Sequence, residues 1–211
     1  MSDPVSPREN SSRQRFLEAA DDQFIAHGYD RCTIRAIAAK AGTSLASLTR
    51  NWKGKQDLFS EVFQRHFDPV HSAQNERFDV LERSGDLSVR SIAEAFFCSA
   101  FGKSGGDGNV RRSHLIYCLA LTDPSEEARA IARSIVMPVR ARVTDLFRRA
   151  LPDMEEQRFF LAMNLVFGSY IYTQMRADRL ADAMNFDIST LNWEEAGATL
   201  ADLVSSGLTR G

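Results

Sequence analysis

The spacing of apolar residues is helical along the whole chain, and no segment shows the alternating pattern of a β-strand. Near the N-terminus Phe16, Ala20 and Phe24 recur four positions apart, and near the C-terminus Leu200 and Val204 do the same. Such spacing places apolar side chains on one face of a helix, so each helix has to bury that face against another helix. The chain is therefore predicted to be all-α.

Length and composition are those of a protein that can form a hydrophobic core of useful size. The chain has 211 residues, of which 44% are hydrophobic, so a core needs neither disulfides nor metal ions. Cys32, Cys98 and Cys118 are too far apart for a zinc or disulfide pattern, and we expect no metal and no cofactor. No apolar run approaches the roughly 20 residues of a membrane span, and the polar N-terminus lacks a signal-peptide pattern. We expect a soluble, cytoplasmic protein with no membrane partner.

Three helical segments lie close together near the N-terminus. We expect them over about 11–28, 33–42 and 44–52, where Ser and Thr can cap the starts and glycines can end the first two. The turn between the second and third contains Gly42. Two short helices joined by such a turn and docked on a longer helix form a helix-turn-helix.

The helices beyond Pro69 are longer, and further signals set their expected limits. We expect a new helix from about Val70, a break or kink after Met137 at Pro138, and a capping box over 153–156 at the start of a long helix. The expected organisation is a disordered arm over residues 1–10, a helix-turn-helix DNA-binding domain over 11–67 and a helical domain over 68–211.

Basic residues are concentrated on the helix-turn-helix of a chain whose net charge is -2. From residue 31 to residue 56 there is no Asp or Glu, whereas the basic residues are Arg31, Arg35, Lys40, Arg50, Lys53 and Lys55. A basic surface of this kind neutralises DNA phosphates and releases their condensed counterions. The pattern favours double-stranded DNA as a partner over a solvated basic face with no partner.

The stretch from Thr33 to Leu58 resembles the signature of the TetR family of transcriptional regulators. The matching residues are Thr33, Ile34, Ile37, Ala38, Ala41, Gly42, Ser44, Leu48, Lys55 and Leu58, and the stretch 24–29 resembles the end of the family's first helix. The chain departs from the family at Ala46, Thr49 and Trp52, where Gly, Tyr and Phe are usual. The resemblance covers about residues 12–62. It implies a dimeric regulator, usually a repressor, that leaves a palindromic operator when a small molecule binds its C-terminal domain.

The third helix is expected to enter the major groove, where a helix fits and base pairs differ in their donor and acceptor patterns. Arg50 is the first candidate for a guanine contact, and Asn51 for an adenine or a phosphate. Leu45 could meet a thymine methyl group or pack within the protein, and both interpretations stay open. With Thr33, Arg35 and Lys55 on phosphates, the predicted DNA-binding set is Thr33, Arg35, Ser44, Leu45, Ser47, Thr49, Arg50, Asn51 and Lys55.

The long helix expected after Asp153 is apolar on nearly every face, which requires burial on all sides. In a domain of this size a second subunit is the natural cover, with a fully buried helix in a monomer as the alternative. Together with the last helix it suggests the intersubunit four-helix bundle that the family resemblance implies. The expected homodimer interface residues are Phe160, Met163, Phe167, Ile171, Leu200 and Val204.

An effector site is expected among the aromatic residues of the C-terminal half. An apolar pocket with few polar groups suits a small hydrophobic effector, and this half loosely resembles regulators that sense fatty acids or their acyl thioesters. The candidates are Phe96, Phe97, Phe101, Tyr117, Cys118, Met137, Phe167 and Tyr170. Taken singly, each is more often an ordinary core residue.

An enzyme and an adaptor are the alternative classes. The histidines are scattered and no G-x-S-x-G or H-E-x-x-H motif occurs, so we expect no catalytic residues. A helical protein-interaction adaptor without sequence-specific DNA binding would explain the helices. It would not explain an acid-free basic stretch on a helix-turn-helix.

Overall fold

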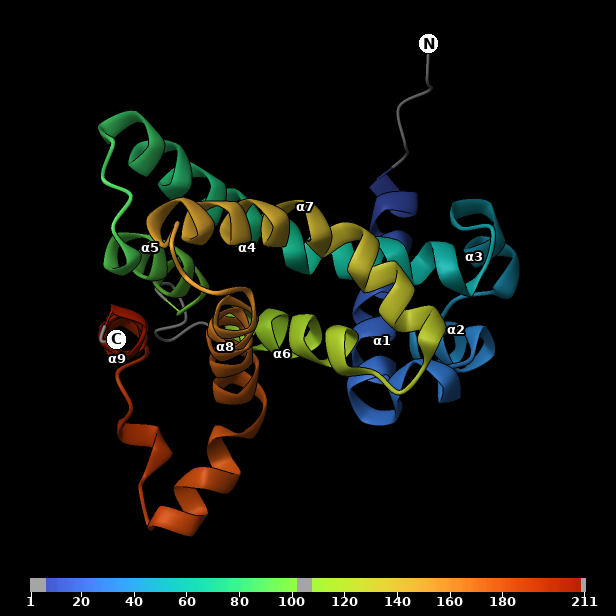
Figure 1. The fold of residues 1–211 in the computed structure, drawn as a ribbon. Helices are drawn as coiled ribbons and strands as arrows, with labels where there is room; N and C mark the ends of the chain where they lie inside the picture. Colours follow the sequence, from blue (N-terminus) through green and yellow to red (C-terminus); the bar gives the residue numbers. More distant parts are fainter. Residues whose placement is uncertain (1–6, 102–107, 210–211) are drawn as a thin grey trace. The chain divides into compact units, whose positions relative to one another are not determined.

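The computed structural model describes residues 7–101 and 108–209, and every regular element within them is a helix (Figure 1). The predicted all-α class is therefore confirmed. None of the described helices is long and apolar enough to cross a membrane. The elements are α1 (Pro7–Arg31), α2 (Ile34–Lys40), α3 (Leu45–Asn51), α4 (Lys55–Ser84), α5 (Val89–Phe101), α6 (Gly108–Thr122), α7 (Glu126–Ala150), α8 (Glu156–Met184), the short 3-10 helix η1 (Ile188–Thr190) and α9 (Trp193–Thr209).

The chain divides into two compact units. The first unit comprises residues 1–66 and 119–135, and the second unit comprises 67–118 and 136–211. Helices α4, α6 and α7 each contribute residues to both units. The sequence had placed everything after residue 67 in one C-terminal domain, so it did not predict that the turn between α6 and α7 returns to the first unit.

Two prolines that were expected to limit helices lie inside them. Helix α4 runs through Pro69, and α7 runs through Pro138. A proline removes one backbone hydrogen bond and crowds the preceding turn. On either side of Pro138, however, the apolar face of α7 is buried, as the side chains of Val136 and Val139 show. The predicted break or kink after Met137 is therefore wrong as far as a break is concerned, and we attribute the continuous helix to this burial.

Two helix starts also differ from their predicted positions. Helix α1 begins at Pro7, before the expected start near Ser11 or Ser12, because a proline in the first turn lacks only an amide that has no intrahelical acceptor. Residues 1–6 of the predicted arm lie outside the described residues. Helix α8 is capped by Glu155. Its carboxylate accepts hydrogen bonds from the backbone amides of Gln157 (3.0 Å) and Arg158 (3.1 Å). The predicted capping box over 153–156 is thus replaced by a single glutamate.

Aromatic side chains join α1 to α4 in the first unit. The ring of Phe24 lies 5.6 Å from that of Phe59 and 5.2 Å from that of Phe63, between centroids. The predicted apolar stripe of Phe16, Ala20 and Phe24 is buried. Helix α1 also contacts the short helices α2 and α3, so it supplies the surface on which they pack.

In the second unit α5 and α9 lie side by side (Figure 1, green and red). Gly197 permits this contact, because a Cβ atom at that position would lie 3.0 Å from Cα of Cys98 and 3.2 Å from the carbonyl carbon of Phe97. An ion pair between Arg90 of α5 and Asp202 of α9, with 2.7 Å between Nε and Oδ1, also joins these helices.

Candidate nucleic-acid interface and effector site

Helices α2 and α3 form the helix-turn-helix, and each begins at a hydroxyl residue that caps it. Thr33 Oγ1 accepts a hydrogen bond from the amide of Ala36 (3.1 Å), and Ser44 Oγ accepts one from the amide of Ser47 (3.2 Å). Gly42, in the turn between the helices, has a φ of 62°, a left-handed conformation that glycine adopts without steric cost. The predicted starts of both helices are confirmed.

The inner face of α3 is fixed in the core of the first unit. Leu48 is fully buried, and Trp52, which caps the C-terminal end of the helix, is 2% exposed. The Trp52 ring packs edge-on against Phe16 (5.7 Å between centroids), and its Nε1 donates a hydrogen bond to Glu61 Oε2 (2.8 Å). A phenylalanine, usual at this position in the resembled family, could not make this bond. The tryptophan therefore keeps the aromatic packing and adds a hydrogen bond to Glu61.

The outer face of α3 is exposed. Leu45 is 42% exposed, which favours the interpretation that it is available to DNA over the one that packs it in the core. Thr49, Arg50 and Asn51 are also exposed. Their side chains donate hydrogen bonds to carbonyl oxygens one turn back in the helix, at 3.2, 3.4 and 2.8 Å. The bond of Arg50 uses Nε, which leaves its two terminal nitrogens for another acceptor.

Lys55 and Lys40, two of the six predicted basic residues, contact residues of α1. Lys55 Nζ lies 3.4 Å from the carbonyl oxygen of Asp30 and 4.0 Å from the centre of the Tyr29 ring. Lys40 Nζ lies 3.0 Å from Asp22 Oδ2. A phosphate contact by Lys55, as the sequence predicts, would therefore have to compete with a cation–π contact inside the first unit.

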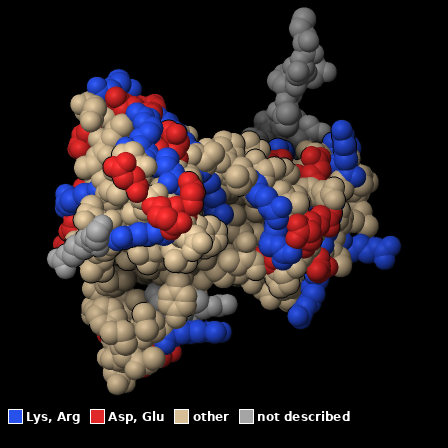
Figure 2. All heavy atoms as spheres, in the orientation of Figure 1, with Lys and Arg blue, Asp and Glu red and all other residues tan. Residues whose placement is uncertain are grey.

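Exposed positive charge is present on and beside α2 and α3. Arg35, Arg50 and Lys53 are exposed, and Figure 2 shows basic side chains projecting at the edge that carries these two helices. This is the arrangement that phosphate contacts on either side of a groove require.

The turn between α6 and α7 is hydrogen-bonded to the end of α1. Asp123 in this turn is 6% exposed, and its carboxylate accepts hydrogen bonds from the amides of Tyr29 (3.1 Å) and Ser125 (2.8 Å). Gly28, with a φ of 71°, leaves room for this carboxylate, since a Cβ there would lie 3.4 Å from Asp123 Oδ2. The sequence analysis did not predict this contact between Asp123 and α1.

Several aromatic residues predicted for the effector site lie together in the second unit. Tyr170 is at their centre, with ring centroids 5.6 Å from Tyr117, 5.8 Å from Phe101 and 5.9 Å from Phe96. All four residues are buried. We call Phe96, Phe101, Tyr117 and Tyr170 the aromatic cluster.

The other predicted effector residues surround this cluster at different depths. Phe97 and Phe167 both pack edge-on against Phe96, at 5.2 and 5.7 Å between centroids. Cys118 is buried, and burial raises the pKa of its thiol to about 12. Met137 is 49% exposed, so it belongs to the surface and not to the interior.

Two buried histidines that the sequence analysis did not select complete the cluster. His114 Nδ1 lies 3.0 Å from Tyr170 Oη, and His71 Nε2 lies 3.5 Å from Tyr117 Oη. Burial lowers the pKa of each histidine to about 4, and the positive charge of Arg140 contributes at His71. Both are therefore neutral near pH 7. The available signal was spacing, because His114 lies three positions before Tyr117 on the same face of α6.

A groove of about 590 Å³ lies between α7 and α8. One face of α7 and two phenylalanines of α8 form its walls. The lining residues are Met137, Arg140, Ala141, Thr144, Asp145, Arg148, Phe159 and Phe167. We call it the α7–α8 groove, and it contains two of the predicted effector residues, Met137 and Phe167.

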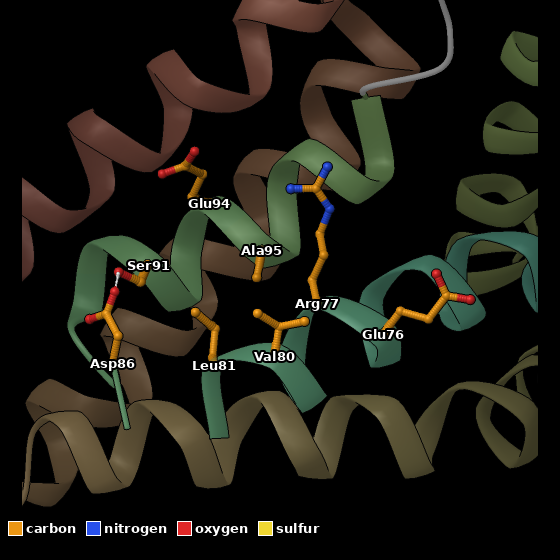
Figure 3. Close-up of a pocket in the computed structure, with 8 residues that line it drawn as sticks. All are labelled: Glu76, Arg77, Val80, Leu81, Asp86, Ser91, Glu94 and Ala95. Carbon is orange, nitrogen blue, oxygen red and sulfur yellow. Dashed lines mark hydrogen bonds between the residues drawn. The ribbon is translucent and has the colours of Figure 1, made fainter. Parts of the chain in front are cut away.

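A second hollow, of about 490 Å³, lies between α4 and α5 (Figure 3). Three carboxylates, those of Glu76, Asp86 and Glu94, line it with a single guanidinium, that of Arg77. Ser91 Oγ donates a hydrogen bond to Asp86 (2.7 Å). Its acidic lining does not suit a hydrophobic ligand. In the described part of the chain, no three His, Cys, Asp or Glu side chains are grouped so that they could hold a metal ion.

The residues predicted for the dimer interface differ in exposure. Met163 and Val204 are buried within the chain itself, whereas Phe160 is 66% exposed. Phe167, Ile171 and Leu200 are half-buried. Five further large apolar residues on α8 are exposed although the sequence did not select them for the interface, namely Leu161, Leu165, Tyr172, Leu180 and Met184. We call Phe160, Leu161, Leu165 and Tyr172 the exposed α8 face.

A capped helix-turn-helix with an exposed polar and basic outer face defines a helix-turn-helix DNA-binding protein. Two family models match the chain. The one described as "Bacterial regulatory proteins, tetR family" matches residues 16–62, and the one described as "Tetracyclin repressor-like, C-terminal domain" matches residues 94–207. The chain belongs to the TetR family of transcriptional regulators.

Individual relatives are distant. An uncharacterized HTH-type transcriptional regulator of Mycobacterium bovis, Mb1581, is 34% identical over 94 residues, which are 43% of this chain and 44% of that relative. This match thus spans less than half the length of the relative. A TetR-like regulator from Rhodococcus sp. RHA1 has a solved structure with 25% identity, a TM-score of 0.61 and full coverage of both chains. The Bacillus subtilis regulator FadR, solved in complex with stearoyl-CoA, has 17% identity and a TM-score of 0.59 over 92% of this chain and 98% of its own.

Proposed function

We propose that this chain acts as a homodimer that binds a palindromic operator through α3 and leaves it when a small hydrophobic effector binds the second unit. The two-sided arrangement of α3 carries the proposal. Leu48 and Trp52 hold its inner face in the core, while Arg50 and Asn51 stand exposed on the outer face. A helix held in this way can enter a major groove without losing its own support.

The exposed α8 face supports a homodimer. Phe160 and Leu161 are 66% and 65% exposed, and large exposed apolar side chains gathered on one helix are characteristic of an interaction surface. A second copy of the chain would cover this face by two-fold symmetry. Two recognition helices would then lie about 34–36 Å apart, which is one turn of DNA.

The aromatic cluster supports an apolar effector. It gathers four of the residues predicted for the effector site, and the TetR-fold neighbour FadR was solved with stearoyl-CoA. An effector lowers operator affinity only by as much as it binds the DNA-free arrangement more tightly. We expect a repressor, in line with the "repressor-like" description of the matching C-terminal model. We assign the chain no catalytic activity.

Charge reversal separates this function from that of a helical adaptor. We expect Arg50→Glu to abolish operator binding in fluorescence anisotropy and to leave the dimer intact in analytical ultracentrifugation. Arg83→Glu, on an exposed arginine near the end of α4, makes the same charge change away from α3 and should keep operator binding. Equal loss in both variants would point to bulk charge, and a wild-type protein that dimerises without binding DNA would favour the adaptor.

A further inference from the structure

One cation in the α7–α8 groove has no described counter-charge. Arg140 is half-buried, and its guanidinium carbon lies 5.1 Å from the centre of the Phe167 ring. Among the side chains that the structure describes, none forms an ion pair with Arg140. A cation withdrawn from water is costly unless an anion or strong acceptors replace the lost hydration.

The other charges of the groove are paired. Arg148 lies over the ring of Phe159 (3.6 Å) and pairs with Glu156 (2.9 Å between Nη2 and Oε2). Asp145 pairs with Arg149, at 3.6 Å between Oδ2 and Nη1. The uncompensated charge of the described groove is therefore that of Arg140.

Arg140 is also linked to the aromatic cluster through ring contacts. Phe167, beneath its guanidinium, packs against Phe96, and Phe96 packs against Tyr170. Burial raises the pKa of Tyr170 and of Tyr117, and the positive charge of Arg140 opposes this rise at both residues. The aromatic cluster is therefore close enough to Arg140 for an electrostatic interaction, although the side chains of the cluster are neutral near pH 7.

We propose that the α7–α8 groove binds an amphipathic organic anion, with its carboxylate or phosphate on Arg140 and its apolar body against Met137, Phe159 and Phe167. A guanidinium matches the two oxygens of either anion in a bidentate pair. The groove volume of about 590 Å³ is in the range of small-molecule sites. This inference rests on the proposed function in that it names the class of effector, but binding to the groove can be measured without DNA.

Two fluorescent probes with the same aromatic body test the charge directly. Anilinonaphthalene sulfonate is an anion, and N-phenylnaphthylamine is its neutral counterpart. Both emit more strongly in an apolar site, so titration of the purified protein gives a dissociation constant for each. We expect Arg140→Gln to weaken binding of the anion about ten-fold or more and to change binding of the neutral probe less than two-fold. Arg140→Lys should keep part of the preference for the anion, because it keeps the charge and loses the bidentate geometry.

A matched variant controls for net charge. Arg133→Gln removes an exposed charge from the same helix, where Arg133 pairs with Glu126 at 3.2 Å, and it should leave both probes unaffected. An equal loss of both probes in Arg140→Gln would assign Arg140 a structural role and overturn the proposal. No binding of the anion to the wild-type protein, or binding that Arg140→Gln does not weaken, would also overturn it.

Competition distinguishes the two sources of the anion. Displacement of the probe by dodecanoate, and not by dodecanol, would identify a free carboxylate. Displacement only by dodecanoyl-CoA would identify the phosphates of a thioester carrier. Displacement by dodecanol as effectively as by dodecanoate would contradict a charged ligand. A protein that passes these tests and binds no operator DNA would refute the regulator proposal while keeping the anion site.

Discussion

The backbone amide of Tyr29 donates a hydrogen bond of 3.1 Å to Oδ2 of Asp123, which lies 94 positions further along the chain. The bond joins the end of α1 to the turn between α6 and α7. Helices α6 and α7 both continue into the second unit. A movement of either helix on effector binding would therefore act directly on the turn that joins them, and this turn is hydrogen-bonded to α1 of the first unit.

We expect Asp123→Ala to lower the free energy of unfolding by about 1–3 kcal/mol, because it leaves the buried amides of Tyr29 and Ser125 without their acceptor. Asp123→Asn keeps one carboxamide oxygen as an acceptor and should cost less. Urea unfolding at neutral pH measures both. Asp153→Ala, at an exposed position, is the control and should change stability by less than about 0.5 kcal/mol. A similar value for Asp123→Ala would contradict the role given to this bond.

Gly197→Ala should destabilise the protein by about 1–3 kcal/mol, because the new methyl group would meet the backbone of α5 at 3.0 Å. Gly207→Ala, in the same helix, has no atom within 4 Å of the added carbon and should be neutral or stabilising by up to about 1 kcal/mol. Thermal unfolding of the two variants side by side tests the pair. If both gained stability, the close contact of α5 and α9 would be wrong.

Leu165→Glu should convert the dimer into a monomer, since it places a charge on the exposed α8 face, where a second copy would bury it without a partner. Val80→Glu provides the comparison: Val80 is 55% exposed on α4, and this variant should stay dimeric. Sedimentation velocity gives both masses. A dimer that survives Leu165→Glu would place the interface on another surface.

Stability should fall in mild acid through the buried histidines. The pKa of His114 is about 4 in the folded protein against the usual 6.5, so between these values the unfolded chain binds the proton and the folded chain does not. The contribution of His114 to the free energy of unfolding is thus fully present above about pH 6.5 and is lost as the pH falls towards 4. We expect the fall from about pH 7 to about pH 4.5 to be smaller in His114→Gln by on the order of 2 kcal/mol.

His27→Gln is the matched control for this pH dependence. His27 is exposed, so its removal should leave the loss of stability in acid as it is in the wild type. If His114→Gln and the wild type lost equal stability over the same pH range, the burial of a neutral histidine beside Tyr170 would not be a source of acid sensitivity.

Local sequence signals predicted the first unit well. The caps at Thr33 and Ser44 and the glycine at position 42 are interactions between residues a few positions apart, which a sequence displays directly. The same kind of signal predicted a break or kink at Pro138, whereas α7 runs through this residue. The burial that keeps α7 continuous depends on packing with other helices, which a local signal does not contain.

The second unit was predicted only in part, for the same physical reason. An apolar pattern on every face of α8 indicates burial on all sides, but it does not say which face packs within the protomer. Met163 and Val204 are buried there, and Phe160 is not. The role proposed for Arg140 depends on a groove between α7 and α8, and the bond of Tyr29 depends on a residue 94 positions away. These are contacts between different helices, and the spacing of apolar residues within one helix does not predict them.

Fluorescence anisotropy on the DNA that flanks the gene of this protein tests the central claim, which is that α3 reads an operator. At about 0.15 M salt we expect the wild-type protein to bind this DNA at least about a hundred-fold more tightly than scrambled DNA of equal length. Arg50→Ala should weaken binding to the flanking DNA by about 1–3 kcal/mol and binding to scrambled DNA much less. Equal binding of both DNAs, with no extra loss for the flanking DNA in Arg50→Ala, would contradict sequence recognition by α3.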